Sequence, residues 1–568
     1  MYIPRLTVLV AACALSLAGC STLATDTKPQ FLRSYEPTAS EEPEVGPQPG
    51  QEPDLLLREF FSASAIPTGD YAAARAFLAP SIRQTWAPDG NTLVVNAVDI
   101  TTVFDSSNSN RRVFTVRGSV IGTLEEGGSY LPENGAYEAE ITMEKIQGEW
   151  RVTDLPQNVV IERTELRNQY QPQNLYFYES TGSSLIADRR WIFSGENSLN
   201  TELVTMIMEG PSARIKPAVA DIVPRDAIFA GMEGGVYRFT GMADMDESQR
   251  RRFAAQLVWT LSNAGVPGPY SATADGTNLV PDVELLTTDD FVEFNPRTSA
   301  DSVPALYAVI DANVHSVMGN EATPVAGPLG ASGEVQSAEV SANGVIAAVR
   351  VSGNGKSQLV IGELGGPLIE SIEGRTLSRP SLEHDRDAAW IVVDGTTVVR
   401  LVPSSDKNRI VEREVNTSAL EGIPGEISVL RLSPAGARVA MIIDGRIFTG
   451  VVTRVSPGET RIVNVHELAT ELGGTALTLD WQPDGSLIVG TSTPEAPVWR
   501  LEQDGSSLSM LPAGNITAPV VSIAANRSTI YATDARTMLQ FSPSETDAVF
   551  WREVPGLQGL RAAPIVAD

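Results

Sequence analysis

Thr475-Ala476-Leu477-Thr478-Leu479-Asp480-Trp481, followed by the turn Pro483-Asp484-Gly485, is one of five similar segments that decide the fold of the C-terminal half. The other four occupy residues 334–340, 376–382, 427–432 and 520–524, and each precedes a turn and another strand-like run. These units recur about every 40 to 50 residues, which is the spacing of four-stranded propeller blades. We therefore predict an all-β propeller of five or six blades over residues 304–568. Residues 562–566 are expected to close the ring against residues 306–310.

The N-terminus carries a second decisive stretch, Leu17-Ala18-Gly19-Cys20, at the end of an apolar run over residues 6–15. That run is too short to cross a bilayer as a permanent helix, and Arg5 precedes it, as in a signal peptide. A Leu-small-Gly-Cys box in this position is typical of the site where bacterial lipoproteins are cleaved and acylated. We predict a signal peptide over residues 1–19 and a mature chain that begins with lipid-bearing Cys20. Two acyl chains on one cysteine would supply stable membrane anchoring.

The composition limits the classes of partner and cofactor. The formal net charge is -28 and the sequence pI is about 4.6, so phosphates repel the chain and nucleic acid is a poor partner. Once Cys13 leaves with the signal peptide, Cys20 is the remaining cysteine, which excludes a disulfide and a cysteine metal site. A chain of 568 residues with 42% hydrophobic content can instead be stabilised by hydrophobic burial. Residues 20–53 are rich in Pro, Glu and Thr and are predicted to form a disordered tether.

Residues 54–165 are predicted to form a first α+β domain. Asp54 is expected to cap an apolar helix over residues 55–61, and Asp70 is expected to start a second helix. Apolar and acidic residues alternate over 137–144, and the turn Gln147-Gly148 leads into Trp150, which indicates antiparallel strands with one buried face. Two helices followed by such a sheet resemble the cone-shaped NTF2-like fold, which often keeps a pocket.

Residues 174–297 are predicted to form a second α+β domain. A helix over 202–208, a strand over 236–240 and a long helix from about Asp246 to Gly265 follow one another. The stretches Glu209-Gly210-Pro211, 256–261 and Asp275-Gly276, in this order, are similar to the GerMN domain of spore-germination and lipoprotein families. The resemblance implies a small module that binds or scaffolds at the cell envelope, with no catalytic residues to transfer.

Two motifs could indicate ligand chemistry but have simpler interpretations. Gly353-Asn354-Gly355-Lys356-Ser357 ends like a phosphate-binding loop, yet Arg350 stands where the leading glycine belongs and no helix follows. We interpret it as a hairpin turn. The acidic group Asp244, Asp246 and Glu247 lacks the twelve-residue loop of a calcium site and fits the start of a helix.

The remaining candidates also favour structural roles. The three histidines, His315, His384 and His466, are widely spaced and lack the near neighbours of a zinc motif. The tryptophans of the C-terminal half could line a ligand-binding face, but packing within blades is the favoured interpretation; they include Trp390, Trp481, Trp499 and Trp551. No Gly-x-Ser-x-Gly elbow is present, so we assign no catalytic, cofactor-binding or metal-binding residue. A catalytic role for a pair of carboxylates stays open, since any fold brings some of the 70 acidic residues together.

The order of lipobox, tether, helix-sheet domain, GerMN-like module and propeller resembles the LpqB lipoproteins of actinobacteria. The resemblance implies a non-enzymatic accessory protein on the outer face of the cell membrane. Its implied partner is the extracytoplasmic domain of a two-component sensor kinase, MtrB, whose signalling governs envelope homeostasis and cell division.

Two other classes of function stay open at this point. A receptor for cell-envelope glycans or peptides would be favoured by an aromatic-lined cavity in the first domain or on the propeller face. A propeller hydrolase or lyase would require convergent acids or a metal site at one mouth of the propeller.

Overall fold

The computed structural model describes residues 46–88, 90–103, 109–195, 198–296, 304–383, 386–404, 409–456, 458–543 and 549–567. The predicted signal peptide, Cys20, most of the tether and His384 lie outside these residues. No helix in the described part of the chain is long and apolar enough to cross a bilayer.

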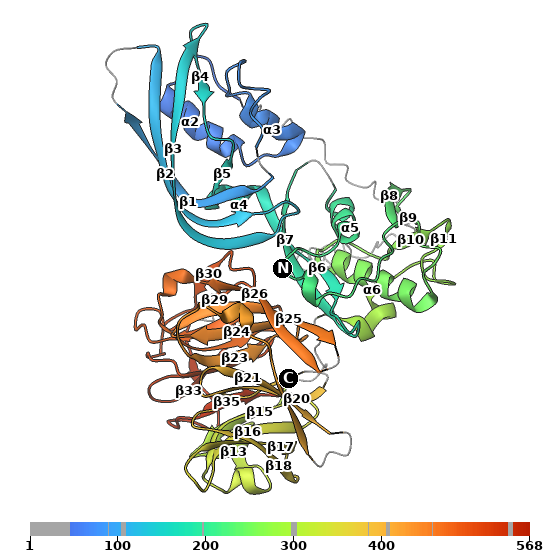
Figure 1. Ribbon diagram of the computed structural model, residues 1–568, viewed down its shortest axis with the longest axis vertical. Helices are drawn as coiled ribbons and strands as arrows, with labels where there is room; N and C mark the ends of the chain where they lie inside the picture. Colours follow the sequence, from blue (N-terminus) through green and yellow to red (C-terminus); the bar gives the residue numbers. More distant parts are fainter. Residues whose placement is uncertain are drawn as a thin grey trace, which may run out of the picture. The chain divides into compact units, whose positions relative to one another are not determined.

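The first domain packs helices against a five-stranded sheet (Figure 1). Its helices are α2 (Pro53–Ala63), α3 (Thr68–Arg75) and α4 (Arg163–Gln169). The sheet runs in the order β4 (Glu149–Asp154), β3 (Tyr130–Ile146), β2 (Arg111–Leu124), β1 (Thr92–Val103) and β5 (Val159–Glu162). Ile141 and Met143 are buried while Glu140 and Glu144 are exposed, as predicted, but Thr142, expected on the exposed face, is buried as well. The helices and the sheet confirm the α+β class.

Both helix starts in this domain differ from the sequence-based expectation. The cap position of α2 is Glu52, and Asp54 lies in the first turn, so the prediction of an Asp54 cap was wrong. Pro53 takes the first helical position because that residue needs no backbone N–H. The segment α3 starts at Thr68, ahead of Asp70, whose left-handed backbone (φ 58°) does not start a regular helix.

The second domain combines a long hairpin with a four-stranded sheet and two helices (Figure 1). The hairpin consists of β6 (Tyr170–Tyr178) and β7 (Leu185–Phe193). The helices are α5 (Leu199–Glu209) and α6 (Glu247–Asn263), with two short 3-10 turns, η1 (Lys216–Ala218) and η2 (Thr288–Phe294). The sheet has the order β11 (Thr277–Asn278), β10 (Ser271–Ala274), β9 (Val236–Thr240) and β8 (Ile228–Glu233).

The long helix α6 begins as its sequence indicates. The Asp246 carboxylate accepts a hydrogen bond from Gln249 N at 2.8 Å, and Gln249 Oε1 accepts one from Asp246 N at 2.9 Å. This capping box gives Asp246 a structural role at the helix start, whereas Asp244 is exposed. Phe253 and Leu257 are fully buried in the domain core, as the predicted apolar stripe requires.

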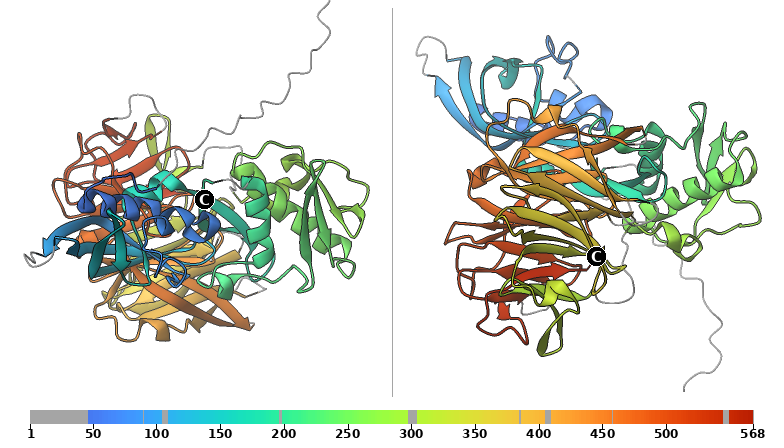
Figure 2. Two further views of the ribbon diagram at one scale, coloured as in Figure 1. Left: turned by 90° about the horizontal axis from the view of Figure 1, so that it is seen from above. Right: turned by 60° about the horizontal axis from the view of Figure 1, so that its bottom comes forward.

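The C-terminal region holds six four-stranded sheets within the described residues from 304 to 567, shown from two further sides in Figure 2. The first sheet comprises β12 (Leu306–Ile310), β13 (Asn313–Met318) and β14 (Glu321–Pro324) together with β35 (Ala563–Val566). The second comprises β15 (Val335–Val340), β16 (Val345–Val351), β17 (Ser357–Glu363) and β18 (Leu368–Gly374). The third comprises β19 (Ser381–Glu383), β20 (Arg386–Val393), β21 (Thr397–Pro403) and β22 (Ile410–Glu414). The others comprise β23 (Ile427–Leu432), β24 (Arg438–Ile443), β25 (Arg446–Ser456) and β26 (Glu459–Leu468); β27 (Ala476–Trp481), β28 (Leu487–Thr491), β29 (Val498–Leu501) and β30 (Leu508–Met510); and β31 (Ser522–Ala525), β32 (Ile530–Thr533), β33 (Met538–Phe541) and β34 (Arg552–Glu553). The short 3-10 turns η3 (Pro328–Gly330), η4 (Ser418–Leu420) and η5 (Thr470–Leu472) lie between strands.

The two ends of this region meet in one sheet. Strand β35 pairs antiparallel with β12, with Leu306 opposite Val566 and Val309 opposite Ala563, so the C-terminus completes the sheet that opens the propeller. This confirms the predicted pairing of residues 562–566 with residues 306–310.

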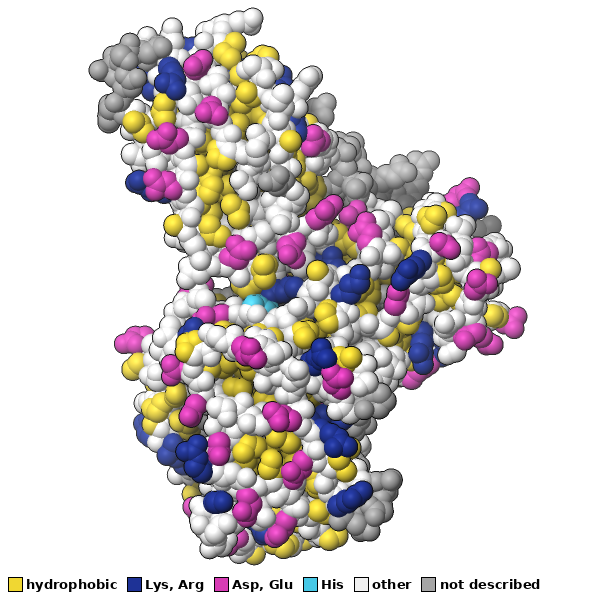
Figure 3. All heavy atoms as spheres, viewed as in Figure 1, with side chains coloured by type: hydrophobic (Ala, Val, Ile, Leu, Met, Phe, Trp, Pro, Cys, Tyr) yellow, Lys and Arg dark blue, Asp and Glu magenta, His cyan; other side chains and the backbone are white. Residues whose placement is uncertain are grey.

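Charge on the visible surface is mixed. Figure 3 shows one face of the molecule, on which acidic and basic side chains are interspersed. The excess of acids is therefore not gathered into a single patch on that face.

Candidate functional site

Strand β7 of the second domain contacts both other domains through its backbone. Trp191 N donates to Gly128 O of the first domain at 2.7 Å. On the propeller side, Arg438 Nη2 donates to Ala187 O at 2.6 Å. Three domains thus meet at one strand, and we call this meeting point the junction.

Side chains of β7 add ion pairs to the junction. Arg189 pairs with Glu502 and with Asp504 of the propeller, each at 3.3 Å. The indole Nε1 of Trp191 also donates to Asp504 Oδ2 at 3.2 Å. Because Asp504 and Trp191 are buried, these contacts are less screened by solvent than surface pairs.

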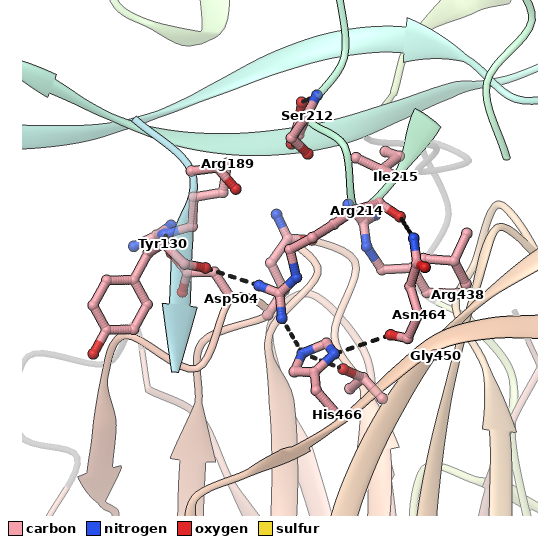
Figure 4. Close-up of a pocket in the computed structure, with 15 residues that line it drawn as sticks. Tyr130, Arg189, Ser212, Arg214, Ile215, Arg438, Gly450, Asn464, His466 and Asp504 are labelled. Carbon is pink, nitrogen blue, oxygen red and sulfur yellow. Dashed lines mark hydrogen bonds and ion pairs between the residues drawn. The ribbon is translucent and has the colours of Figure 1, made fainter. Parts of the chain in front are cut away.

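His466 also lies in the junction, and Figure 4 shows its ring beside Arg214. Arg214 lies between the Tyr130 backbone, to which its Nη1 donates at 2.8 Å, and the His466 ring, which its Nη2 contacts. Burial and the nearby Arg214 charge lower the pKa of His466 to about 3. The ring is therefore uncharged at neutral pH, and its Nε2 can accept hydrogen bonds from Arg214 and Thr449.

A small cavity of about 40 Å³ lies within the junction. All three domains line it, with Tyr130 from the first, Asp188, Arg189 and Arg214 from the second, and Arg438, His466 and Asp504 from the propeller. Three arginines and two aspartates thus line one small cavity.

A second charged cluster, which we call the channel plug, joins the inner strands of the propeller. Arg431 on β23 donates to both carboxylate oxygens of Glu339 on β15, at 2.8 and 2.9 Å, and to Asp480 on β27 at 3.1 Å. Arg379, ahead of β19, donates to Glu339 at 3.0 Å. Two positive and two negative side chains, from three sheets and the segment ahead of a fourth, therefore balance one another in the interior.

The pKa shifts in the channel plug follow from this pairing. Burial disfavours the charged form of Glu339, yet Arg379 and Arg431 hold its pKa below the usual value. Burial likewise opposes the charge on Arg431, but Glu339 and Asp480 raise the pKa of its guanidinium group. Glu339 and Arg431 therefore stay ionised at neutral pH, and Glu339 serves as a structural partner of arginine.

A larger cavity of about 560 Å³ opens beside the plug at the starts of the inner strands. Its lining includes hydroxyl groups from several sheets, Ser337, Ser428, Thr478 and Ser522, together with the exposed Arg561. None of the residues that line it is aromatic. We call this cavity the propeller mouth.

Comparison with known proteins identifies the family. A model described as the LpqB N-terminal domain matches residues 46–167, one described as sporulation and spore germination matches 174–280, and the LpqB β-propeller domain model matches 312–567. Lipoprotein LpqB of Corynebacterium diphtheriae is 43% identical over 99% of this chain and 98% of its own. The chain belongs to the LpqB lipoprotein family.

Other LpqB relatives also align with this chain over nearly their whole length. Lipoprotein LpqB of Corynebacterium jeikeium is 37% identical over 97% of this chain and 96% of its own, and that of Rhodococcus opacus is 33% identical over 98% and 96%. Among solved structures, the β-propeller domain of Myceliophteria thermophila Cps50 (Swd1) covers 39% of this chain and 70% of its own, at 12% identity and a TM-score of 0.28.

The candidate residues named from the sequence lie in different parts of the structure. His466 lies in the junction, whereas His315 lies on β13 and contacts the carbonyl oxygen of Asn313 at 3.1 Å. Trp390, Trp481 and Trp551 are buried in the packing of the sheets, as the packing interpretation requires, whereas Trp499 is half-buried. The 353–356 segment is the turn of the β16–β17 hairpin, in which Val351 pairs with Ser357.

Sequence reasoning missed both charged clusters of this LpqB chain. For the channel plug, a signal was available, since Glu339, Arg431 and Asp480 each stand next to last in one of the repeated segments. For the junction, the signal was the run Asp188-Arg189-Arg190 inside an otherwise apolar strand. His466 and Arg214 carry no comparable local signal, because they are distant in sequence and on different domains.

Proposed function

We propose that this chain is a membrane-anchored extracytoplasmic lipoprotein, held by lipid on Cys20, that acts as a non-enzymatic accessory protein. Its proposed partner is the extracytoplasmic domain of an MtrB-like two-component sensor kinase. Selective binding of one kinase conformation would shift the signalling equilibrium that governs envelope homeostasis and cell division. The observation that carries the proposal is the match to LpqB lipoproteins over nearly the whole chain.

The sequence supports the anchoring part of the proposal. The Leu17-Ala18-Gly19-Cys20 box follows a short apolar run, and a Pro-rich stretch separates Cys20 from the first domain. Such a stretch can act as an extended spacer of roughly 3 Å per residue. Lipid on Cys20 would thus hold the folded domains some distance from the bilayer.

The geometry supports a binding role over catalysis. Glu339 and Asp480, two of the acids buried in the propeller, are engaged by Arg431 and have little freedom to act as acid or base. The junction ties the three domains together through buried polar contacts, including the Arg189–Asp504 pair. A surface composed from several joined domains suits recognition of another protein.

The direct test is calorimetric titration of the chain from Ser21 onward against the purified extracytoplasmic domain of the kinase. We expect saturable binding. No heat of binding from folded protein would contradict the accessory role. Binding of peptidoglycan fragments by the same preparation would then favour the glycan or peptide receptor.

Two substitutions probe the binding surface. Arg561→Glu alters the propeller mouth, and Ile228→Asp alters edge strand β8, where Ile228 is 62% exposed. Both sites are exposed, so both variants should fold normally. We expect at least tenfold weaker kinase binding from the variant whose surface makes the contact, and unchanged binding from the other.

The anchor has a separate test. In cells, Cys20→Ala should move the protein from the membrane fraction to the soluble fraction, because the acylated sulfur is lost. Retention of this variant in the membrane fraction would contradict lipid anchoring at Cys20 without bearing on kinase binding.

A further inference from the structure

Two arginines in the junction cavity have no acidic partner. Among the described residues, neither Arg214 nor Arg438 forms an ion pair. Arg438 donates from Nη2 to the Ala187 carbonyl oxygen, and its side chain forms no other hydrogen bond to described residues. Both side chains are largely shielded from bulk solvent, where a guanidinium group ordinarily requires a negative counterpart.

The two carboxylates that line the cavity are already engaged elsewhere. Asp188 Oδ2 accepts from Arg190 Nε and Nη2 at 3.0 and 2.8 Å, while Ser212 Oγ donates to Oδ1 at 2.8 Å. Asp504 Oδ2 faces Arg189 and Trp191, and its Oδ1 accepts from Ser506 Oγ at 2.6 Å. Neither acid can turn toward Arg214 or Arg438 without giving up these contacts.

His466 fixes the direction of Arg214 without neutralising it. The ring is uncharged, its Nδ1 lies 3.1 Å from the Asn464 carbonyl oxygen, and its Nε2 meets Arg214 and Thr449. Arg214 and Arg438 each depress the pKa of the His466 ring, and Arg214 also contributes to the lowered pKa of Arg438, after burial. One side of the cavity is therefore positively charged. Asp504, Glu125 and Asp188 raise the pKa of Arg214 by their charge, but none of them lies within ion-pair distance of it.

We propose that the junction cavity binds a small monovalent anion, of the size of chloride, that Arg214 and Arg438 hold between the second domain and the propeller. The cavity volume of about 40 Å³ accommodates about three water-sized particles, which fits one halide with water and excludes a bulky organic acid. The anion supplies the negative charge that both guanidinium groups lack. Because its ligands come from two domains, it stabilises their contact.

Thermal unfolding of the purified full-length protein tests the site with chloride and bromide as probes. At constant ionic strength, replacement of sodium gluconate by sodium chloride or bromide should raise the unfolding midpoint and reach saturation. In Arg438→Gln the halide-dependent increase should be lost. In the control Arg461→Gln, whose side chain is 44% exposed and pairs with Glu459, the increase should persist.

An unfolding midpoint that is the same in halide as in gluconate would overturn the proposal. An unchanged halide response in Arg438→Gln would overturn it as well. A second measurement does not depend on the stability of any variant. Crystals of the protein grown in sodium bromide should give an anomalous difference peak in the cavity beside Arg214 and Arg438. Ordered density for the junction without such a peak would also overturn it.

Discussion

Arg431 is the residue on which the channel plug depends most. It bridges Glu339 and Asp480, and all three side chains are buried. Replacement of Arg431 by Met removes the arginine that pairs with Asp480 and leaves Glu339 with Arg379 alone, and we expect a loss of about 3–5 kcal/mol of stability. Urea unfolding of the full chain measures this loss.

The matched control for Arg431→Met is Arg117→Met. Arg117 pairs with Glu138 on the solvent side of the first sheet, where both side chains are 61% exposed. We expect no measurable change from this control, because exposed ion pairs contribute little. Equal effects of the two substitutions would show that the plug is no more important than a surface pair.

His466 makes stability depend on pH. Its pKa is lowered from 6.5 to about 3 by burial and by Arg214, so below pH 6.5 the unfolded chain binds a proton that the folded chain does not. Stability should therefore fall as the pH falls from 6.5 toward 3, by at most about 1.4 kcal/mol per pH unit from this residue. His466→Gln should show a shallower decline in unfolding midpoint over this range, and a decline as steep as that of the wild type would contradict the role of His466.

At the scale of single elements, helix α6 depends on its cap. Asp246→Ala removes the acceptor for Gln249 N, and we expect a loss of about 1 kcal/mol in the free energy of unfolding. The control Asp244→Ala, two residues away on an exposed position, should have no measurable effect. If calcium raised the midpoint of wild type but of neither variant, the acidic group would be a metal site and the helix-cap interpretation would fail.

At the scale of the whole molecule, Gly128 controls how the first domain meets β7. Its φ is 78°, and a Cβ added there would lie 2.4 Å from the backbone oxygen of Trp191. Gly128→Ala should therefore push the first domain away from the second. We expect calorimetry to show a separate, lower-temperature unfolding transition for the first domain.

Gly148→Ala is the matched control for this domain contact. Gly148 also has a positive φ, 91°, but a Cβ there meets nothing within 4 Å. Both variants share the backbone strain of a left-handed alanine, about 1 kcal/mol, and differ only in the clash. A separate transition in both variants, or in neither, would contradict the assigned role of Gly128.

The sequence by itself determined the elements that depend on local order. The repeated segments predicted β23 at its observed bounds and β27 to within one residue, because a short apolar run and the turn that follows it are properties of neighbouring residues. The start of helix α6 could also be predicted from the sequence, since Asp246 and Gln249 cap the helix from within the same turn. The lipobox at Cys20 is likewise a local signal.

Only the tertiary structure decided which charges meet. Arg214 reaches His466 across 252 positions of the chain, and Trp191 reaches Asp504 across 313. With 70 acidic residues and 42 basic ones, the sequence offers many equivalent partners for each charge. The choice among them follows from how the domains dock, and docking is fixed by the summed packing of whole surfaces, which leaves no periodic trace in the sequence.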